Sequence, residues 1–164
     1  MAQPPRRVRY FPGRLLTDED LAAEQAYHRQ MRYLVNRLHG HGIASGLDVD
    51  IVNGEVRVSP GVAIDRVGRE LVLVQPAFVT VGPLGSGGSR ACDLALAWNE
   101  DLEGVVPTPD GATQATWFVE RPRLHLVPPD VVPDAVLLAH LKRTRRGITA
   151  DLSVRRPLGP GTPE

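Results

Sequence analysis

The sequence predicts an α+β protein, mainly β, in which one long N-terminal helix packs on or beside an antiparallel β-sandwich or barrel-like domain of about six to eight short strands. The apolar pattern has a helical period over residues 17–40 and a period of two from Ile43 onward. Glycine and proline, 16 and 15 of the 164 residues, predict frequent turns and argue against a mostly helical protein. Turn signals separate the short alternating runs, which is typical of a sandwich or barrel.

Residues 1–16 are expected to form an extended arm, because three prolines resist helix formation and the run VRYF favours strand. Thr17 begins the helix with T-D-E-D, a pattern like a capping box, and the acidic residues complement the positive helix end. Gly40 is the expected left-handed cap, so the amphipathic helix is predicted over 17–40.

One stripe of this helix is apolar. Its members are Ala23, Tyr27, Met31, Leu34 and Leu38, widened by Ala26 and Val35. A helix of about 33 Å is long for so small a domain. Its length and its stripe favour packing against another subunit.

Residues 41–156 are predicted to form the β-domain, and residues 157–164 a disordered tail. Asn53-Gly54 between two alternating runs predicts a type I′ hairpin. The strands expected after it cover 62–64, 71–74, 78–81, 91–98, 116–127, 136–141 and 148–154. Two long loops are expected, a flexible one at 82–89 and a turn-rich one at 103–113. Pro122 predicts an edge strand or a bulge within 116–127.

Candidate catalytic and metal-binding residues do not form a constellation in the sequence. His39 and His41 lie at the expected helix end, where histidine satisfies carbonyls, and no further ligand has zinc-like spacing. Cys92 alternates with apolar residues, so we interpret it as a core thiol. Asp48 and Asp50 fall on the polar face of a strand, and we expect them to be solvated. Asp65 is the third carboxylate that could form a pair. We therefore predict no enzymatic activity, no metal and no cofactor.

Composition excludes several partners. The net charge is zero and aromatic content is 5%, so nucleic acid is not expected to bind. The longest apolar run, LVLV, is far short of a membrane span, and no secretory signal opens the sequence. A single cysteine indicates a reducing compartment.

The zero net charge hides a segregated pattern. Residues 1–17 carry four arginines and no acidic residue, and residues 142–156 carry six basic residues against one acidic residue. The stretch between them has a net charge of −8. We expect the ends of one copy to pair with the middle of another, in an oligomer that high salt dissociates.

Three segments resemble a known family. They are YFPGRLLTDEDLAAEQAYHRQMRYLVNRLHGHGIASGLDV at 10–49, VSPGVAIDRVGREL at 58–71 and LLAHLKRTRRGITADLSVRR at 137–156. The resemblance is to structural proteins from contractile injection systems and related phage tail-like particles. It implies a baseplate, tail or fibre component, with other particle subunits as partners, in the bacterial cytoplasm or released with a particle.

We therefore expect a non-enzymatic structural or adaptor subunit, forming homo-oligomers, that assembles through its arm and helix. The expected interface residues are Arg9, Tyr10, Phe11, Tyr27, Met31, Leu34, Leu38, Arg143, Arg145 and Arg146. Tyr10 and Phe11 have an alternative, which is packing on their own β-domain. The alternative function is a carbohydrate- or peptide-binding β-module that uses loops 82–89 and 100–114, with Trp98 or Trp117 stacking on the ligand.

Overall fold

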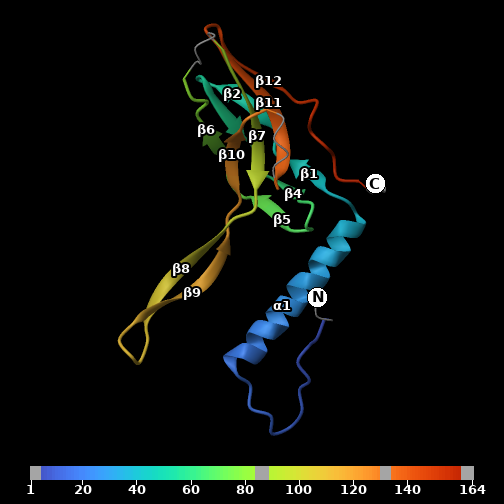
Figure 1. Ribbon diagram of the computed structural model, residues 1–164, viewed down its shortest axis with the longest axis vertical. Coiled ribbons are helices and arrows are strands. Elements are labelled where there is room, and N and C mark those ends of the chain that lie inside the picture. The colour runs from blue at the N-terminus through green and yellow to red at the C-terminus, as the bar shows by residue number, and fades with distance from the viewer. Residues whose placement is uncertain (1–4, 84–88, 130–133, 160–164) are drawn as a thin grey trace.

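The computed structural model describes residues 5–83, 89–129 and 134–159, and within these ranges the chain forms one α-helix and twelve β-strands (Figure 1). The elements are α1 (Asp18–Leu38), β1 (Gly42–Gly46), β2 (Val49–Val52), β3 (Glu55–Val58), β4 (Gly61–Ile64), β5 (Glu70–Leu73), β6 (Ala77–Val79), β7 (Ser89–Ala97), β8 (Glu100–Pro107), β9 (Thr113–Glu120), β10 (Arg123–Val127), β11 (Val136–Thr144) and β12 (Gly147–Asp151). The prediction of a mainly β protein with one helix is confirmed. The predicted number of strands, six to eight, was too low.

Three antiparallel sheets make the body of the molecule, and their strand orders are β1-β4-β5, β2-β3-β6 and β10-β7-β11-β12. All three contribute to one apolar core. The fully buried leucines and valines of this core are Leu47, Leu71, Leu94, Leu96, Leu138, Leu141, Val56, Val58 and Val81. None of the core residues belongs to α1 or to the described part of the arm.

The hairpin between β2 and β3 follows the sequence signal. Asn53 and Gly54 both have positive φ angles, 52° and 81°, as a type I′ turn requires. The strands pair in register across the turn, from Val52↔Glu55 to Val49↔Val58. Alternation then buries the valines of β3 in the core.

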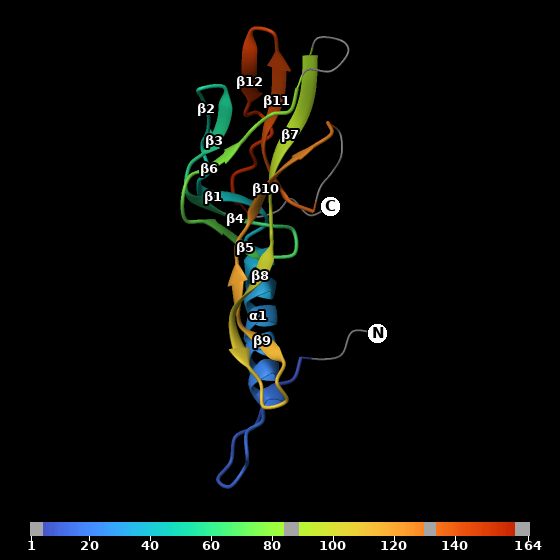
Figure 2. The ribbon, with the colours of Figure 1, turned by 90° about the vertical axis from the view of Figure 1, so that its left-hand side faces the viewer.

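Helix α1 has the predicted capping box: the Thr17 side chain accepts from the Asp20 amide, and the Asp20 side chain accepts from the Thr17 amide. Gly40, just beyond the helix, has a φ of 88°, which suits a glycine at a helix end. The helix buries none of its residues. Figures 1 and 2 show it leaving the body and running away from the three sheets.

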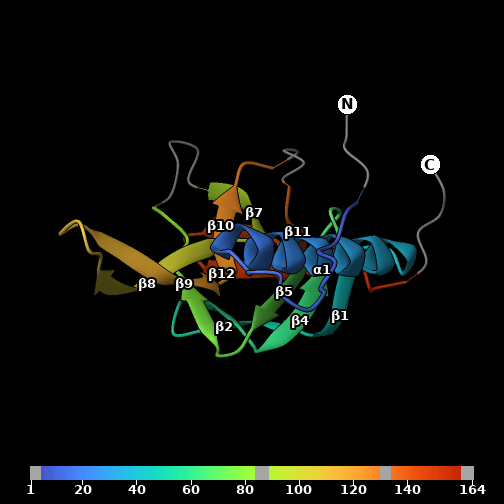
Figure 3. The same ribbon diagram turned by 90° about the horizontal axis from the view of Figure 1, so that it is seen from below.

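Strands β8 and β9 form a separate two-stranded ribbon that also projects from the body (Figure 3). The expectation of a turn-rich loop at 103–113 was wrong, because most of it is ribbon strand and only the tip turns. The single strand expected at 116–127 is also wrong. Pro122, which cannot donate a ladder hydrogen bond, separates β9 from β10, and these two strands belong to different sheets.

The segment after β12 returns to the body. The Ile43 amide donates to the Arg156 carbonyl and the Leu158 amide to the Ile43 carbonyl, each at 2.8 Å. Disorder was therefore the wrong prediction for residues 157–159, because backbone bonds to β1 hold them. Residues 160–164 lie outside the described ranges, as do residues 84–88 of the expected flexible loop.

Candidate subunit interface

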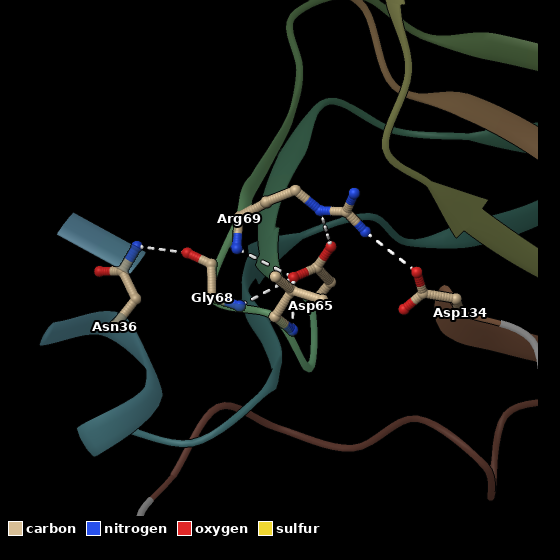
Figure 4. Close-up of polar contacts among 6 residues, drawn as sticks. Asn36, Asp65, Gly68, Arg69 and Asp134 are labelled. Atoms are coloured by element: carbon tan, nitrogen blue, oxygen red, sulfur yellow. Dashed lines mark hydrogen bonds and ion pairs between the residues drawn. The ribbon is translucent and has the colours of Figure 1, made fainter. Parts of the chain in front are cut away.

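The helix is joined to the body through its polar side (Figure 4). Asn36 Nδ2 donates to the Gly68 carbonyl at 2.8 Å and to Glu70 Oε1 at 2.7 Å. Arg32 Nε pairs with the same Glu70 oxygen at 2.9 Å. Gly68, at a φ of 97°, lies so close to the backbone of Tyr33 that an added Cβ would collide with the Tyr33 carbonyl oxygen. This joint consists of few contacts, and all of them are near the C-terminal half of α1.

A buried carboxylate shapes the turn that presents Gly68 to the helix. Asp65 Oδ1 accepts the amides of Val67, Gly68 and Arg69, each at 2.9 Å, and Oδ2 accepts Arg69 Nε at 2.6 Å. Arg69 also reaches Asp134 at 3.2 Å. Sequence reasoning missed this role of Asp65, although an Asp followed by Gly three residues later is a turn signal.

The apolar stripe of α1 lies opposite the joint. Leu34 follows the joint residue Arg32 by two positions, and Leu38 follows Asn36 by two. Two positions correspond to a rotation of about 200° around the helix axis, so both leucines point away from the joint. Leu38 is accordingly 74% exposed, and Leu34 and Val35 are exposed as well. Tyr27 and Met31, farther toward the N-terminus, are half-buried. The predicted interface stripe is thus present, and its C-terminal half is uncovered in this chain.

The arm lies along the N-terminal half of α1, away from the body (Figure 1). Arg14 ties it down, with Nη2 at 2.5 Å from Asp20 and Nη1 donating to the Arg9 carbonyl at 3.1 Å. Tyr10 and Phe11 are both more than half exposed. The alternative that these two rings pack on their own β-domain is therefore wrong, because the arm is next to the helix.

The basic residues near the C-terminus do not join this surface. Arg143 is half-buried and donates to the Val81 carbonyl, which gives it a structural role within the body. Arg145 and Arg146 are exposed at the turn between β11 and β12, at the far end of the molecule from the arm (Figure 1). The structure thus separates the ten predicted interface residues into two distant groups.

The β8–β9 ribbon carries an exposed apolar surface that sequence reasoning missed. Its exposed large side chains are Leu102, Val105, Val106, Trp117 and Phe118. Trp117, a candidate for stacking on a ligand in the alternative function, is 68% exposed. Trp98 is half-buried, and the Arg69 guanidinium lies over its ring at 4.8 Å.

Polar side chains that could support chemistry have other roles. His39 is the C-cap of α1, and His41 Nε2 is 3.2 Å from Arg156 Nη1. Cys92 is buried, and burial raises the pKa of its thiol. Across the described residues, no group of three or more His, Cys, Asp or Glu side chains could hold a metal ion. The helix found there is not apolar enough to cross a membrane.

Comparison with solved structures places the fold among those of type VI secretion baseplate components. A chain of the TssK-TssF-TssG baseplate subcomplex aligns at a TM-score of 0.55 and 15% identity, over 90% of this chain and 60% of that one. TssK itself, in a crystal structure, aligns at 0.57 and 13%, over 90% of this chain and 41% of TssK.

A chain of the baseplate complex from the type VI secretion system aligns at a TM-score of 0.53 and 12% identity, over 91% of this chain and 58% of that one. The present chain thus spans 41 to 60% of the length of these proteins, and the likeness is one of fold. No family model and no curated protein matches the sequence.

Proposed function

We propose that this protein is a non-enzymatic structural or adaptor subunit of a contractile, phage tail-like particle, in its baseplate or an associated part. Its arm and helix contact neighbouring subunits, including further copies of this chain. The observation that carries the proposal is the orientation of α1. The helix is attached by Arg32 and Asn36 and directs the exposed Leu34 and Leu38 away from its own body.

The uncovered apolar stripe of α1 supports an assembly role for this helix. Helices in water gain most of their stability from packing an apolar face, yet α1 buries no residue within its own chain. A partner that covers the stripe would supply the missing packing. The fold similarity to type VI secretion baseplate chains and the family resemblance of the sequence motifs support the same kind of partner.

The test is co-purification of the tagged chain with tail-like particles from its native cells. We expect the wild-type chain to sediment with the particles, and the double variant Leu34→Ser/Leu38→Ser to be lost from them, because it makes the uncovered stripe polar. Absence of the wild-type chain from purified particles would refute the proposal.

The matched control is Val72→Ser/Val74→Ser, which changes two exposed aliphatic residues of the body. This control should sediment as the wild type does. Both double variants should unfold within about 1 kcal/mol of the wild type, because the replaced side chains are exposed. A stripe variant that still assembles fully would show that α1 is not the contact.

Binding of a carbohydrate or peptide remains the alternative function, and the exposed Trp117 is the observation that favours it. The alternative requires that the purified chain binds a glycan or peptide on an array and that Trp117→Ala abolishes the binding without unfolding the chain. Trp98 is a poor candidate for the same role, because Arg69 covers its ring.

A further inference from the structure

The β8–β9 ribbon is a sheet of two strands whose outer edges are unpaired in the described chain. A two-stranded ribbon is marginally stable in water, and open edges invite another strand. Its apolar side chains are also uncovered, with Trp117 and Phe118 68% and 67% exposed. A large aromatic residue buries about 150–250 Å² when it is covered, so these two rings offer part of the roughly 800 Å² that one partner contributes to a standard interface. The ribbon therefore has the properties of a docking element.

The ribbon is acidic. Residues 100–120 contain five acidic residues and no basic residue. At the base of the ribbon, Arg121 and Arg123 neutralise part of this charge, through ion pairs with Asp101 and Glu103 at 2.7–3.3 Å. Of the other three acids, Glu120 lies 3.9 Å from Arg32 of α1, Glu100 is at the base of the ribbon and Asp110 is at its tip. A partner for this surface should be basic, partly aromatic and extended.

The arm of this same chain has that chemistry. Residues 5–16 contain four arginines and no acidic residue, and Tyr10, Phe11, Leu15 and Leu16 among them are exposed. Residues 5–11 form no strand in the structure, although the run VRYF is rich in strand formers. The arm and the ribbon are thus opposite in charge, and both have exposed apolar side chains and unpaired backbone groups.

The described part of the arm, residues 5–16, does not meet the ribbon within one molecule. In Figure 1 the arm and the ribbon lie on opposite sides of α1. The arm instead lines the helix beside Glu19, Asp20 and Ala23. A contact between two copies satisfies both segments without refolding the body.

We propose that the arm of one copy docks on the β8–β9 ribbon of a second copy and adds a strand to its open edge. Main-chain bonds along the edge give affinity, and the arm arginines facing the ribbon carboxylates set the choice of partner. The inference rests on the proposed assembly role, because it specifies how two copies join. It also assigns the acidic middle and the basic N-terminus, which the sequence places in different segments, to one contact.

Cross-linking between two singly substituted chains tests this contact. Tyr10→Cys places a thiol on the arm, and Phe118→Cys places one on the ribbon. The two variant chains carry tags of different size, are mixed in equal amounts and are treated with a short bismaleimide. We expect a heterodimer band at least about tenfold stronger than for the control mixture, because docking raises the effective thiol concentration to the millimolar range. The control mixture pairs Tyr10→Cys with Phe78→Cys, since Phe78 is 56% exposed on the body. The native Cys92 is buried, and unsubstituted chains give the background.

Charge reversal provides a second measurement that does not depend on cysteine. The variant Arg6→Glu/Arg7→Glu/Arg9→Glu and the variant Glu100→Lys/Asp110→Lys should each be monomeric by light scattering, and their mixture should recover the wild-type complex. A wild-type chain that is monomeric at micromolar concentration, or equal cross-linking in the two mixtures, would overturn the contact. Co-sedimentation of that monomeric chain with particles would leave the proposed function standing. Cross-linking found only in a single chain carrying both cysteines would place the arm on its own ribbon and also overturn the proposal.

Discussion

Asp65 is 2% exposed and carries a carboxylate that the folded chain must compensate. Three backbone amides and one guanidinium supply the compensation, and all four donors come from the next four residues. The side chain thus fixes a local loop, and that loop presents the Gly68 carbonyl to Asn36. One buried side chain therefore determines where the helix attaches.

Asp65→Asn should lower the free energy of unfolding by roughly 2–4 kcal/mol, because the charge is lost and an amide group then faces the donors. Urea denaturation followed by circular dichroism measures the change. Asp50→Asn is the matched control, since Asp50 is exposed and its ion pair with Arg57 is long at 3.6 Å. We expect a change within about 0.5 kcal/mol. Equal effects at the two sites would contradict the role assigned to Asp65.

Residues whose role depends on local sequence were the predictable ones. Asn53-Gly54 and Thr17 follow rules of turn and cap geometry that involve only neighbouring residues. The contacts of Arg69 were not predicted, because its partners Asp134 and Trp98 come from distant segments. No local pattern marks a contact across 65 residues.

At the scale of the element, α1 is held by few polar contacts and a close backbone approach. Gly68→Ala should lower stability by more than the roughly 1–2 kcal/mol that a left-handed backbone costs alone, because its Cβ also meets the Tyr33 carbonyl. Gly54→Ala is the matched control, with a positive φ and nothing within 4 Å of the added Cβ.

The measurement is urea denaturation combined with the rate of tryptic cleavage at the helix arginines. Gly68→Ala should accelerate cleavage within α1 by loosening its attachment, whereas Gly54→Ala should leave that rate unchanged. Similar behaviour of the two variants would show that the close approach of Gly68 to Tyr33 does not hold the helix.

The two projecting elements differed in how far the sequence could predict them. A 21-residue helix has a long periodic signal and caps at both ends, so α1 was expected in nearly its observed place. The β8–β9 ribbon is exposed on both faces, so burial imposes no clear alternation on it. Pro107, Pro109 and Gly111 around its turn favoured the wrong prediction of a loop.

At the scale of the whole molecule, the packed core and the projecting elements are separable. Among the residues that the structure describes, every buried residue of the apolar core lies between Ile43 and Leu141, and none belongs to α1 or the β8–β9 ribbon. The ribbon continues the pairing of β7 with β10, where Ala97 already faces Arg123. The body therefore contains the interactions that define the fold, and the projections contribute surface.

Removal of residues 1–39 should leave a cooperatively folded body, with the free energy of unfolding lowered by about 1–3 kcal/mol for the lost joint. A second variant, in which Asn-Gly links Trp98 to Pro122 in place of the ribbon, should also fold, because β7 and β10 are already adjacent and antiparallel. Circular dichroism and urea denaturation measure both.

If either deletion abolished the cooperative transition, that projection would be part of the folding unit, and its exposed apolar side chains would need an explanation other than contact with a partner. Retention of the transition in both variants would mean that the exposed stripe of α1 and the exposed face of the ribbon are dispensable for folding, which is the property expected of surfaces that serve assembly.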